Sequence, residues 1–176
     1  MAPKPETGSV QIGKYRVVTY SYGTGENVLF LLNGGPGLPC NYLREPMLRM
    51  VEDGYRVVIY DQLGCGASDR PKDPALWTIS RYVEEVETVR QSLGLGQVHL
   101  LGHSWGGWLS IEYALTFPQA LKSLVLSNTC ADMLHRARAD QARDAVRDLV
   151  AINLFHEGSK CGGRRQDGTN STGGRR

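Results

Sequence analysis

The chain has 176 residues, of which 41% are hydrophobic and 22% are charged, and its formal net charge is +2. This length and composition predict one globular domain with a core, and no run of about 18 apolar residues predicts a membrane span. Residues 1–10 lack the apolar segment of a secretory signal. We therefore expect a cytoplasmic protein with no membrane partner.

Positive charge gathers near the end of the chain. Residues 158–176 contain five Lys or Arg and one Asp, which leaves 15 basic and 17 acidic residues in 1–157. The basic pI is thus a property of the last segment alone. We expect no nucleic-acid partner, because residues 1–157 carry a net charge of −2.

The cysteines are scattered along the chain, at Cys40, Cys65, Cys130 and Cys161. They form no C-x-x-C pair and have no histidine at the spacing of a metal ligand. This pattern favours buried free thiols over a metal site or a disulfide framework.

Short apolar runs alternate with helical patterns from the amino terminus onward. An antiparallel hairpin is predicted from Val10–Ile12 and Tyr15–Tyr20, around Gly13-Lys14. Further strands are predicted at Val28–Leu32, Arg56–Tyr60, Val98–Leu101 and Leu121–Leu126, and helices at Thr78–Leu93 and Gly106–Phe117. Strand, helix and strand in this order predict the α/β class, a mostly parallel sheet with helices on both faces.

The helix at Thr78–Leu93 has an apolar face and a charged face. The apolar face consists of Ile79, Tyr82, Val83, Val86 and Leu93. The charged side chains expected to point to water are Arg81, Glu84, Glu85 and Glu87.

The strand at Val28–Leu32 ends in the sequence NGGPG, residues 33–37. Glycine and proline between a strand and a helix form a turn without any further function in most proteins. Alternatively, the glycines leave backbone N–H groups open to a ligand or a reacting oxygen. The choice depends on what another part of the chain supplies.

That part is GHSWGG, residues 102–107, which fits the pattern G-x-S-x-G between a predicted strand and a predicted helix. A sharp strand-to-helix turn exposes the central serine, Ser104, as a nucleophile. A helix N-cap is the alternative role for Ser104, but a cap does not require glycine on both sides. His103 is expected to project away from Ser104, and His99 to be a core histidine of the strand.

These two motifs and DQLGCGAS, residues 61–68, resemble the proline iminopeptidase family of α/β-hydrolases over Val10 to Asn128. The resemblance implies the α/β-hydrolase fold, of which this chain would hold the N-terminal part. It also implies a serine aminopeptidase or amidase that releases an N-terminal residue, usually proline, through an acyl-enzyme. The substrate would be a small peptide or amino-acid amide, and neither a metal nor an organic cofactor is required.

The same resemblance implies roles for single residues. Ser104 corresponds to the nucleophile, and the backbone N–H groups of Gly35 and Trp105 correspond to the oxyanion hole. The supporting loop residues are Gly34, Pro36, Gly37, Gly102 and Gly106. The family implies a cis peptide bond before Pro36, and residues 61–68 are expected to form a tight loop that borders the active site, since the third glycine of a dinucleotide-binding loop is missing.

The chain departs from the family at several positions. Asn33 replaces a usual His and Leu63 a usual Arg, which extends the implied substrates to other small amino-acid amides. The triad acid and base have no counterpart, since His135 and His156 do not match the family's base. We expect an α/β-hydrolase core in 1–130, the start of a cap or a remnant helix in 131–157, with helical potential at Asp144–Phe155, and a disordered Gly/Arg-rich tail in 158–176.

Two interpretations follow from this ending. The chain is either a truncated hydrolase, for example one shortened by a frameshift, or a native short protein. Accordingly, one functional hypothesis is an iminopeptidase-type serine hydrolase, inactive in this short form. The other is a noncatalytic α/β-hydrolase remnant or binding protein.

Overall fold

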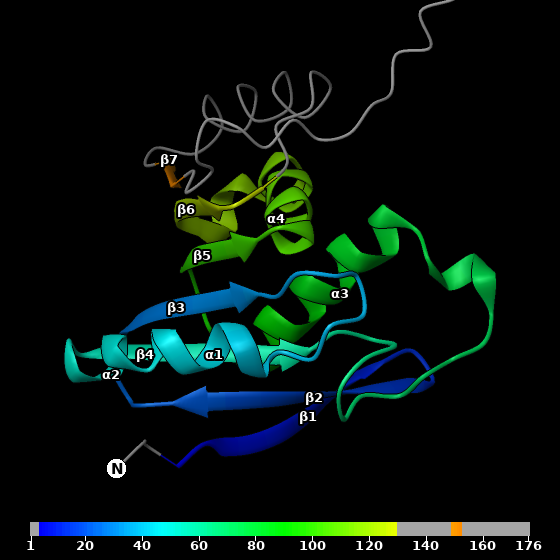
Figure 1. The fold of residues 1–176 in the computed structure, drawn as a ribbon, viewed down its shortest axis with the longest axis horizontal. Helices are drawn as coiled ribbons and strands as arrows, with labels where there is room; N and C mark the ends of the chain where they lie inside the picture. The colour runs from blue at the N-terminus through cyan, green and yellow to red at the C-terminus, as the bar shows by residue number, and fades with distance from the viewer. Residues whose placement is uncertain (1–3, 130–148, 153–176) are drawn as a thin grey trace, which may run out of the picture.

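The computed structural model describes residues 4–129 and 149–152. Within them a seven-stranded sheet has the strand order β1-β2-β4-β3-β5-β6-β7 (Figure 1). The strands are β1 (Glu6–Ile12), β2 (Tyr15–Tyr22), β3 (Asn27–Leu32), β4 (Tyr55–Asp61), β5 (Val98–His103), β6 (Leu121–Ser127) and β7 (Leu149–Ile152). The pairs β1/β2 and β2/β4 are antiparallel and all others are parallel, which confirms the predicted class and the predicted hairpin.

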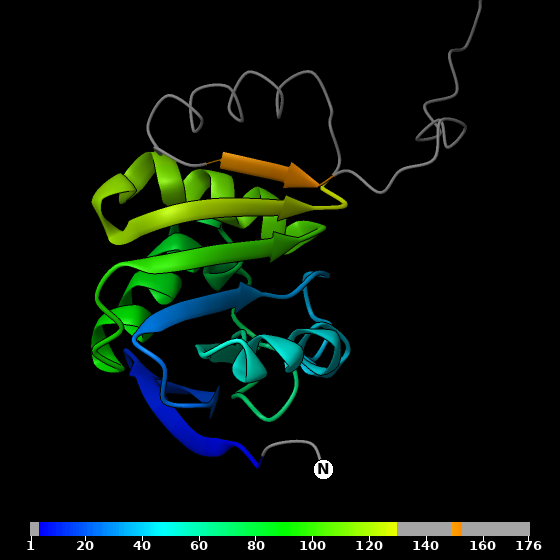
Figure 2. The ribbon, with the colours of Figure 1, turned by 90° about the vertical axis from the view of Figure 1, so that its left-hand side faces the viewer.

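Helices cover both faces of this sheet (Figures 1 and 2). One face carries α1 (Asn41–Met47) and α2 (Arg49–Glu52), and the other carries α3 (Ile79–Ser92) and α4 (Trp105–Thr116). Two short 3-10 turns, η1 (Pro74–Leu76) and η2 (Pro118–Ala120), precede α3 and β6. Both predicted helices are confirmed, and Thr78 caps α3 by accepting a hydrogen bond from the Arg81 N–H.

The core has two halves because side chains alternate along each strand. On β3, Phe30 and Leu32 pack in the cluster beneath α3 and α4. Leu29 and Leu31 point the other way and pack with Leu43 of α1. Strands buried on both faces read as continuous apolar runs, which explains why the sequence marked them clearly.

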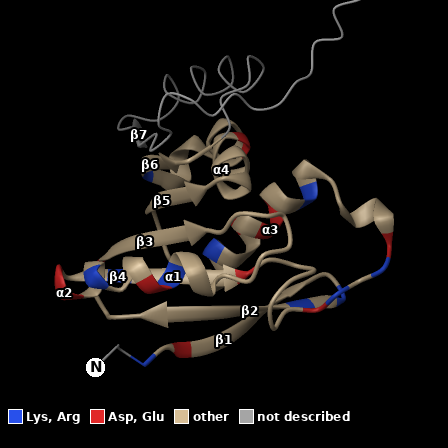
Figure 3. Cartoon of the chain, in the orientation of Figure 1, with Lys and Arg blue, Asp and Glu red and all other residues tan. Residues whose placement is uncertain are grey.

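The prediction that the charged side chains of α3 all point to water is partly wrong. Glu84 is exposed, as predicted, but Glu85 is fully buried and forms an ion pair with Arg81, which is itself only partly exposed. Residues that are three or four positions apart in a helix lie on the same side of it, so Glu85 shares the face of Tyr82 and Val89. Both signs of charge occur along α3 (Figure 3), and part of this charge is thus internal rather than hydrated.

The later part of the chain is described only at residues 149–152. Where the sequence indicated helical potential, these four residues form β7, a strand parallel to β6. The rest of the predicted cap or remnant helix and the predicted tail lie outside the described residues, as do His135 and His156.

Two smaller expectations concern the thiols and the membrane. Cys40 and Cys65 are free and buried, as predicted, whereas Cys130 and Cys161 lie outside the described residues. In the part of the chain that the structure describes, each helix is too short or too polar to cross a bilayer.

Candidate active site

Ser104 lies at the sharp turn between β5 and α4. Its φ of 54° and ψ of −117° lie in a region that residues other than glycine rarely adopt. Ser104 occupies the N-cap position of α4, yet its side chain makes no capping hydrogen bond. The hydroxyl is therefore not used as a helix cap, and the strained backbone presents it at the end of the sheet.

Glycines on either side of Ser104 allow this turn to form. A Cβ on Gly102 would lie 2.3 Å from the Gly106 carbonyl oxygen, and a Cβ on Gly106 would lie 2.1 Å from the Leu32 carbonyl oxygen. Real side chains do not approach backbone atoms so closely. The serine turn, residues 102–106, thus packs directly against the end of β3.

The glycine loop, residues 33–37, lies beside this turn. A Cβ on Gly34 would be 3.2 Å from the Ser104 Cβ. Gly35 is exposed, has a φ of 131°, and is joined to Pro36 by the cis peptide bond that the sequence resemblance implied. Loop and serine are brought together here by tertiary structure, although about 70 residues separate them in the chain.

The backbone N–H groups of Gly35 and Trp105 are alike in their hydrogen bonding. Neither donates a hydrogen bond to any residue in the described ranges. Trp105 is the first residue of α4, where the helix leaves its initial N–H groups unpaired and its dipole is positive. Among the described residues, neither group thus has an internal acceptor.

Tyr42 of α1 connects the glycine loop to the serine turn. Its hydroxyl accepts a hydrogen bond from the Gly34 N–H at 2.5 Å and lies 3.0 Å from the His103 Nδ1. The rings of Tyr42 and His103 meet edge to face, with centroids 5.5 Å apart. His103 thus turns toward α1, and burial lowers its pKa from the usual 6.5.

Gln62, just after β4, makes a second connection between the same two segments. Its Nε2 donates to the Asn33 carbonyl oxygen at 3.3 Å, and its Oε1 accepts from the Trp105 indole N–H at 3.1 Å. Gln62 is only 1% exposed, so both of its amide ends are satisfied inside the protein.

Asp61 organises the loop of residues 61–68 that borders the site. Its carboxylate accepts from the Cys40 N–H at 3.0 Å and from the Ala67 N–H at 2.9 Å. Gly66 passes so close that a Cβ there would lie 2.0 Å from the Asp61 Cγ. The loop is tight, as predicted, because its backbone wraps around a buried carboxylate.

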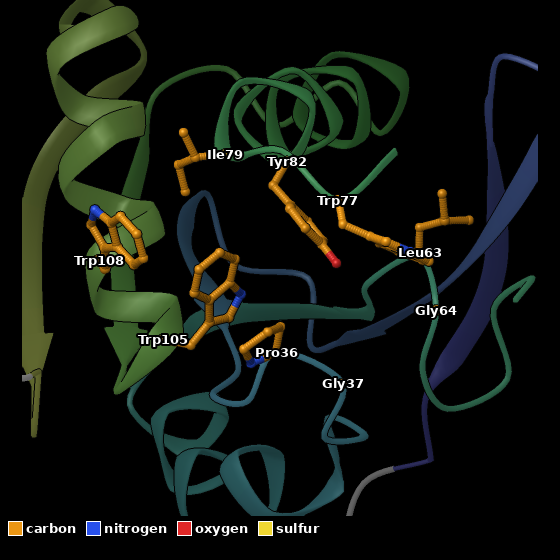
Figure 4. A pocket seen from close by; sticks show the side chains of 9 residues that line it. All are labelled: Pro36, Gly37, Leu63, Gly64, Trp77, Ile79, Tyr82, Trp105 and Trp108. Carbon is orange, nitrogen blue, oxygen red and sulfur yellow. The ribbon is translucent and has the colours of Figure 1, made fainter. Parts of the chain in front are cut away.

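An apolar pocket of about 560 Å³ opens next to the glycine loop (Figure 4). It is lined by Pro36, Gly37, Leu63, Gly64, Trp77, Ile79, Tyr82, Trp105 and Trp108. Tyr82 stacks on Trp77 and meets Trp105 edge to face, so aromatic rings form a large part of the wall. Such a wall suits an apolar group of a ligand that reaches Ser104.

The geometry of strand, strained serine and helix agrees with the comparison with protein families. Residues 27–151 match the family described as the alpha/beta hydrolase fold. The chain belongs to the α/β-hydrolase family. The serine turn, the glycine loop and residues 61–68 are the features from which the sequence predicted this fold.

Several proteins that are similar in sequence to this α/β-hydrolase chain are named proline iminopeptidases. The chain is 46% identical over 116 residues to one from Clostridium botulinum, covering 65% of this chain and 39% of that protein. It is 40% identical over 157 residues to one from Flavobacterium johnsoniae, covering 82% and 53% respectively. A crystal structure of the Mycobacterium smegmatis proline iminopeptidase matches with a TM-score of 0.69 and 33% identity, over 77% of this chain and 48% of that one. The chain thus spans about half or less of the length of these relatives.

The two described histidines of this α/β-hydrolase chain both have other contacts. His99 lies 2.8 Å from the Ser123 Oγ through its Nδ1 and packs edge to face on Tyr55, as expected of a core histidine. His103 faces Tyr42, as described above. Neither contact joins an imidazole to the Ser104 hydroxyl.

The sequence did not indicate the roles of Tyr42, Gln62 and Glu85. Gln62 belongs to the DQLGCGAS motif, which was interpreted only as a tight loop. Tyr42 carries no local signal, because its partners lie 8 and 61 residues away. For Glu85 the helical spacing from Tyr82 was the signal available.

Proposed function

We propose that Ser104 is the nucleophile of a serine hydrolase of proline iminopeptidase type. Its Oγ attacks the carbonyl carbon of an N-terminal residue, proline or another small amino acid. The C–N bond then breaks, the amine leaves with a proton, and water hydrolyses the acyl group bound to Ser104. The whole reaction also needs a general base and a general acid.

The observation that carries this proposal is the strained turn at Ser104, which leaves its side chain without a capping hydrogen bond and lies close to the glycine loop. An attacked carbonyl oxygen becomes an anion, and the Gly35 and Trp105 N–H groups can stabilise it. Losing one such donor costs about 3 to 4 kcal/mol of transition-state stabilisation in well-studied hydrolases. The glycine loop also lies close to the serine turn, since a Cβ on Gly34 would be 3.2 Å from the Ser104 Cβ, a proximity that a turn without function does not require.

The aromatic pocket supports a small apolar residue as the group that is released. Its wall includes Pro36 and Trp105, which adjoin the two donors, so a ring or short side chain held there stays close to Ser104. A noncatalytic remnant or binding protein is the competing function. The engagement of His99 and His103 with other partners favours it.

A boronic acid analogue of proline, pyrrolidine-2-boronic acid, tests the nucleophile. When the Ser104 oxygen bonds to boron, the boron becomes tetrahedral and negatively charged, and the hydroxyl proton passes to solvent. We expect the tetrahedral signal in ¹¹B NMR with the parent chain and not with Ser104→Ala. Boron that stays trigonal with both proteins would contradict the proposal and favour the noncatalytic alternative.

A further inference from the structure

The two proposed oxyanion donors come from different segments, which raises the question of what sets their relative position. Gly35 belongs to the loop after β3 and Trp105 to the first turn of α4. The loop itself is exposed from Gly35 to residue 39. Its geometry therefore depends on groups that hold it from outside.

The peptide unit between Asn33 and Gly34 is held at both of its polar ends. Its N–H, on Gly34, donates to the Tyr42 hydroxyl, and its C=O, on Asn33, accepts from the Gln62 Nε2. Tyr42 belongs to α1 and Gln62 follows β4, so the two partners are independent of each other in sequence. Rotation of this peptide plane would break both hydrogen bonds at once.

The Tyr42 hydroxyl and the Gln62 side-chain amide also contact the residues on either side of Ser104. Tyr42 meets the His103 Nδ1, and Gln62 accepts from the Trp105 indole. Either the Tyr42 hydroxyl or the His103 Nδ1 can be the donor of this bond, depending on the imidazole tautomer, and burial of His103 lowers its pKa in favour of the neutral form.

We infer that Tyr42 and Gln62 are positioning residues that clamp the Asn33–Gly34 peptide and so aim the Gly35 N–H at the oxygen bound beside Ser104. The inference rests on the proposed function of Ser104. The peptide that follows the clamped one carries the Gly35 N–H, and its direction depends on the orientation of the plane before it. Tyr42 and Gln62 make no bond to the reacting atoms themselves.

The test uses Tyr42→Phe and Gln62→Met, each of which keeps the bulk of the side chain and removes its hydrogen bonds. Tyr55→Phe is the matched control, because it removes a hydroxyl at the opposite end of β4. Binding of pyrrolidine-2-boronic acid is followed by ¹¹B NMR under conditions where circular dichroism shows every variant folded. We expect the adduct to be about tenfold weaker in both test variants, a displaced donor costing less than a deleted one, and unchanged in the control.

A second readout separates positioning from a general loss of stability. In the parent chain, adduct formation should move the amide proton resonances of Gly35 and Trp105 downfield, as both N–H groups bond to the boronate oxygen. In Tyr42→Phe at saturating boronic acid, we expect a smaller shift at Gly35. Parental affinity and parental shifts in both variants would overturn the clamp while leaving Ser104 as the nucleophile. Absence of an adduct in the parent chain would overturn the proposed function and the clamp together.

Discussion

At the scale of single residues, Gly106 determines how closely α4 approaches the sheet. Its Cα faces the carbonyl oxygens of Leu32 and Asn33, the last residue of β3 and the first of the glycine loop. Backbone oxygens cannot move aside as the end of a flexible side chain can. The serine turn therefore packs against β3, the strand that leads into the glycine loop.

Replacing Gly106 by alanine tests this contact. The new Cβ would lie 2.1 Å from the Leu32 oxygen, and relieving the clash should lower the free energy of unfolding by about 3 kcal/mol. This loss exceeds the gain of about 1 kcal/mol that alanine offers over glycine within a helix. The measurement is urea denaturation.

Gly8→Ala is the control for this substitution. A Cβ on Gly8 meets only the side-chain hydroxyl of Thr19, at 3.1 Å, so we expect a change below about 1 kcal/mol. Equal losses in the two variants would show that Gly106 is not a close-packing position.

At the scale of elements, α3 connects several parts of the site through its charged side chains. Glu85 accepts from the Leu63 N–H at 3.1 Å, while Arg81 pairs with Glu85 and donates to the Leu76 carbonyl oxygen at 2.5 Å. The Arg81 guanidinium also lies 3.8 Å from the centroid of the Tyr82 ring. Burial raises the pKa of Glu85, and the Arg81 guanidinium opposes that shift. The pair thus fixes two parts of the pocket wall: Leu63, through Glu85, and the segment beside Trp77, through Arg81.

A second acidic residue of α3, Glu87, makes stability depend on pH. Hydrogen bonds from Arg90, and further ones from Tyr113 of α4, lower the pKa of Glu87 despite its partial burial. An acid whose pKa is lower in the folded state stabilises the fold above its unfolded pKa and loses that contribution as the pH falls. We expect the free energy of unfolding of the parent chain to fall between about pH 5 and 3, and to fall less steeply in Glu87→Gln.

The control for this prediction lies on the same helix. Glu84 is exposed, so Glu84→Gln should leave the slope of stability against pH close to that of the parent. A slope in Glu87→Gln as steep as in the parent would contradict the role assigned to the bonds from Arg90 and Tyr113.

At the scale of the whole molecule, the proposed machinery gathers at the carboxyl ends of the parallel strands. The glycine loop follows β3, Gln62 follows β4, and Ser104 follows β5. Ligand sites in open α/β sheets lie at this edge, where loops from neighbouring strands meet. The described part of the chain thus brings together the proposed nucleophile, the two proposed donors and a pocket, while its two histidines contact other residues.

This arrangement predicts that the 176 residues alone do not turn over amides. A serine hydroxyl is a weak nucleophile at neutral pH, and losing the triad base costs on the order of a millionfold in turnover in a comparable hydrolase. Prolyl and alanyl naphthylamides, assayed beside Ser104→Ala, provide the measurement, and we expect equal rates with both proteins. Turnover that disappears in Ser104→Ala would contradict this prediction and direct the search for a base to His135 and His156.

The sequence alone determined the class of fold, strands β1 to β6, helices α3 and α4, and the candidate nucleophile, whereas α1 and α2 were not predicted. These features depend on local patterns: continuous apolar runs for strands buried on both faces, a 3.6-residue period for α3, and glycines around Ser104 that only a sharp turn requires. The cis peptide bond before Pro36 was predicted from the family resemblance and not from a local sequence pattern. The strand at Leu149–Ile152 was predicted neither from the resemblance nor from a local pattern.

Tertiary structure alone decided which groups hold the site together. Tyr42 reaches His103 across 61 residues, Gln62 reaches Trp105 across 43, and Glu85 reaches Leu63 across 22. A polar side chain carries no periodic signal that names its partner, because the partner is selected by how the strands are placed next to one another. The candidate nucleophile was therefore predictable from its own turn, whereas the inferred clamp around the neighbouring loop became visible only once β3, β4 and β5 lay side by side in the sheet.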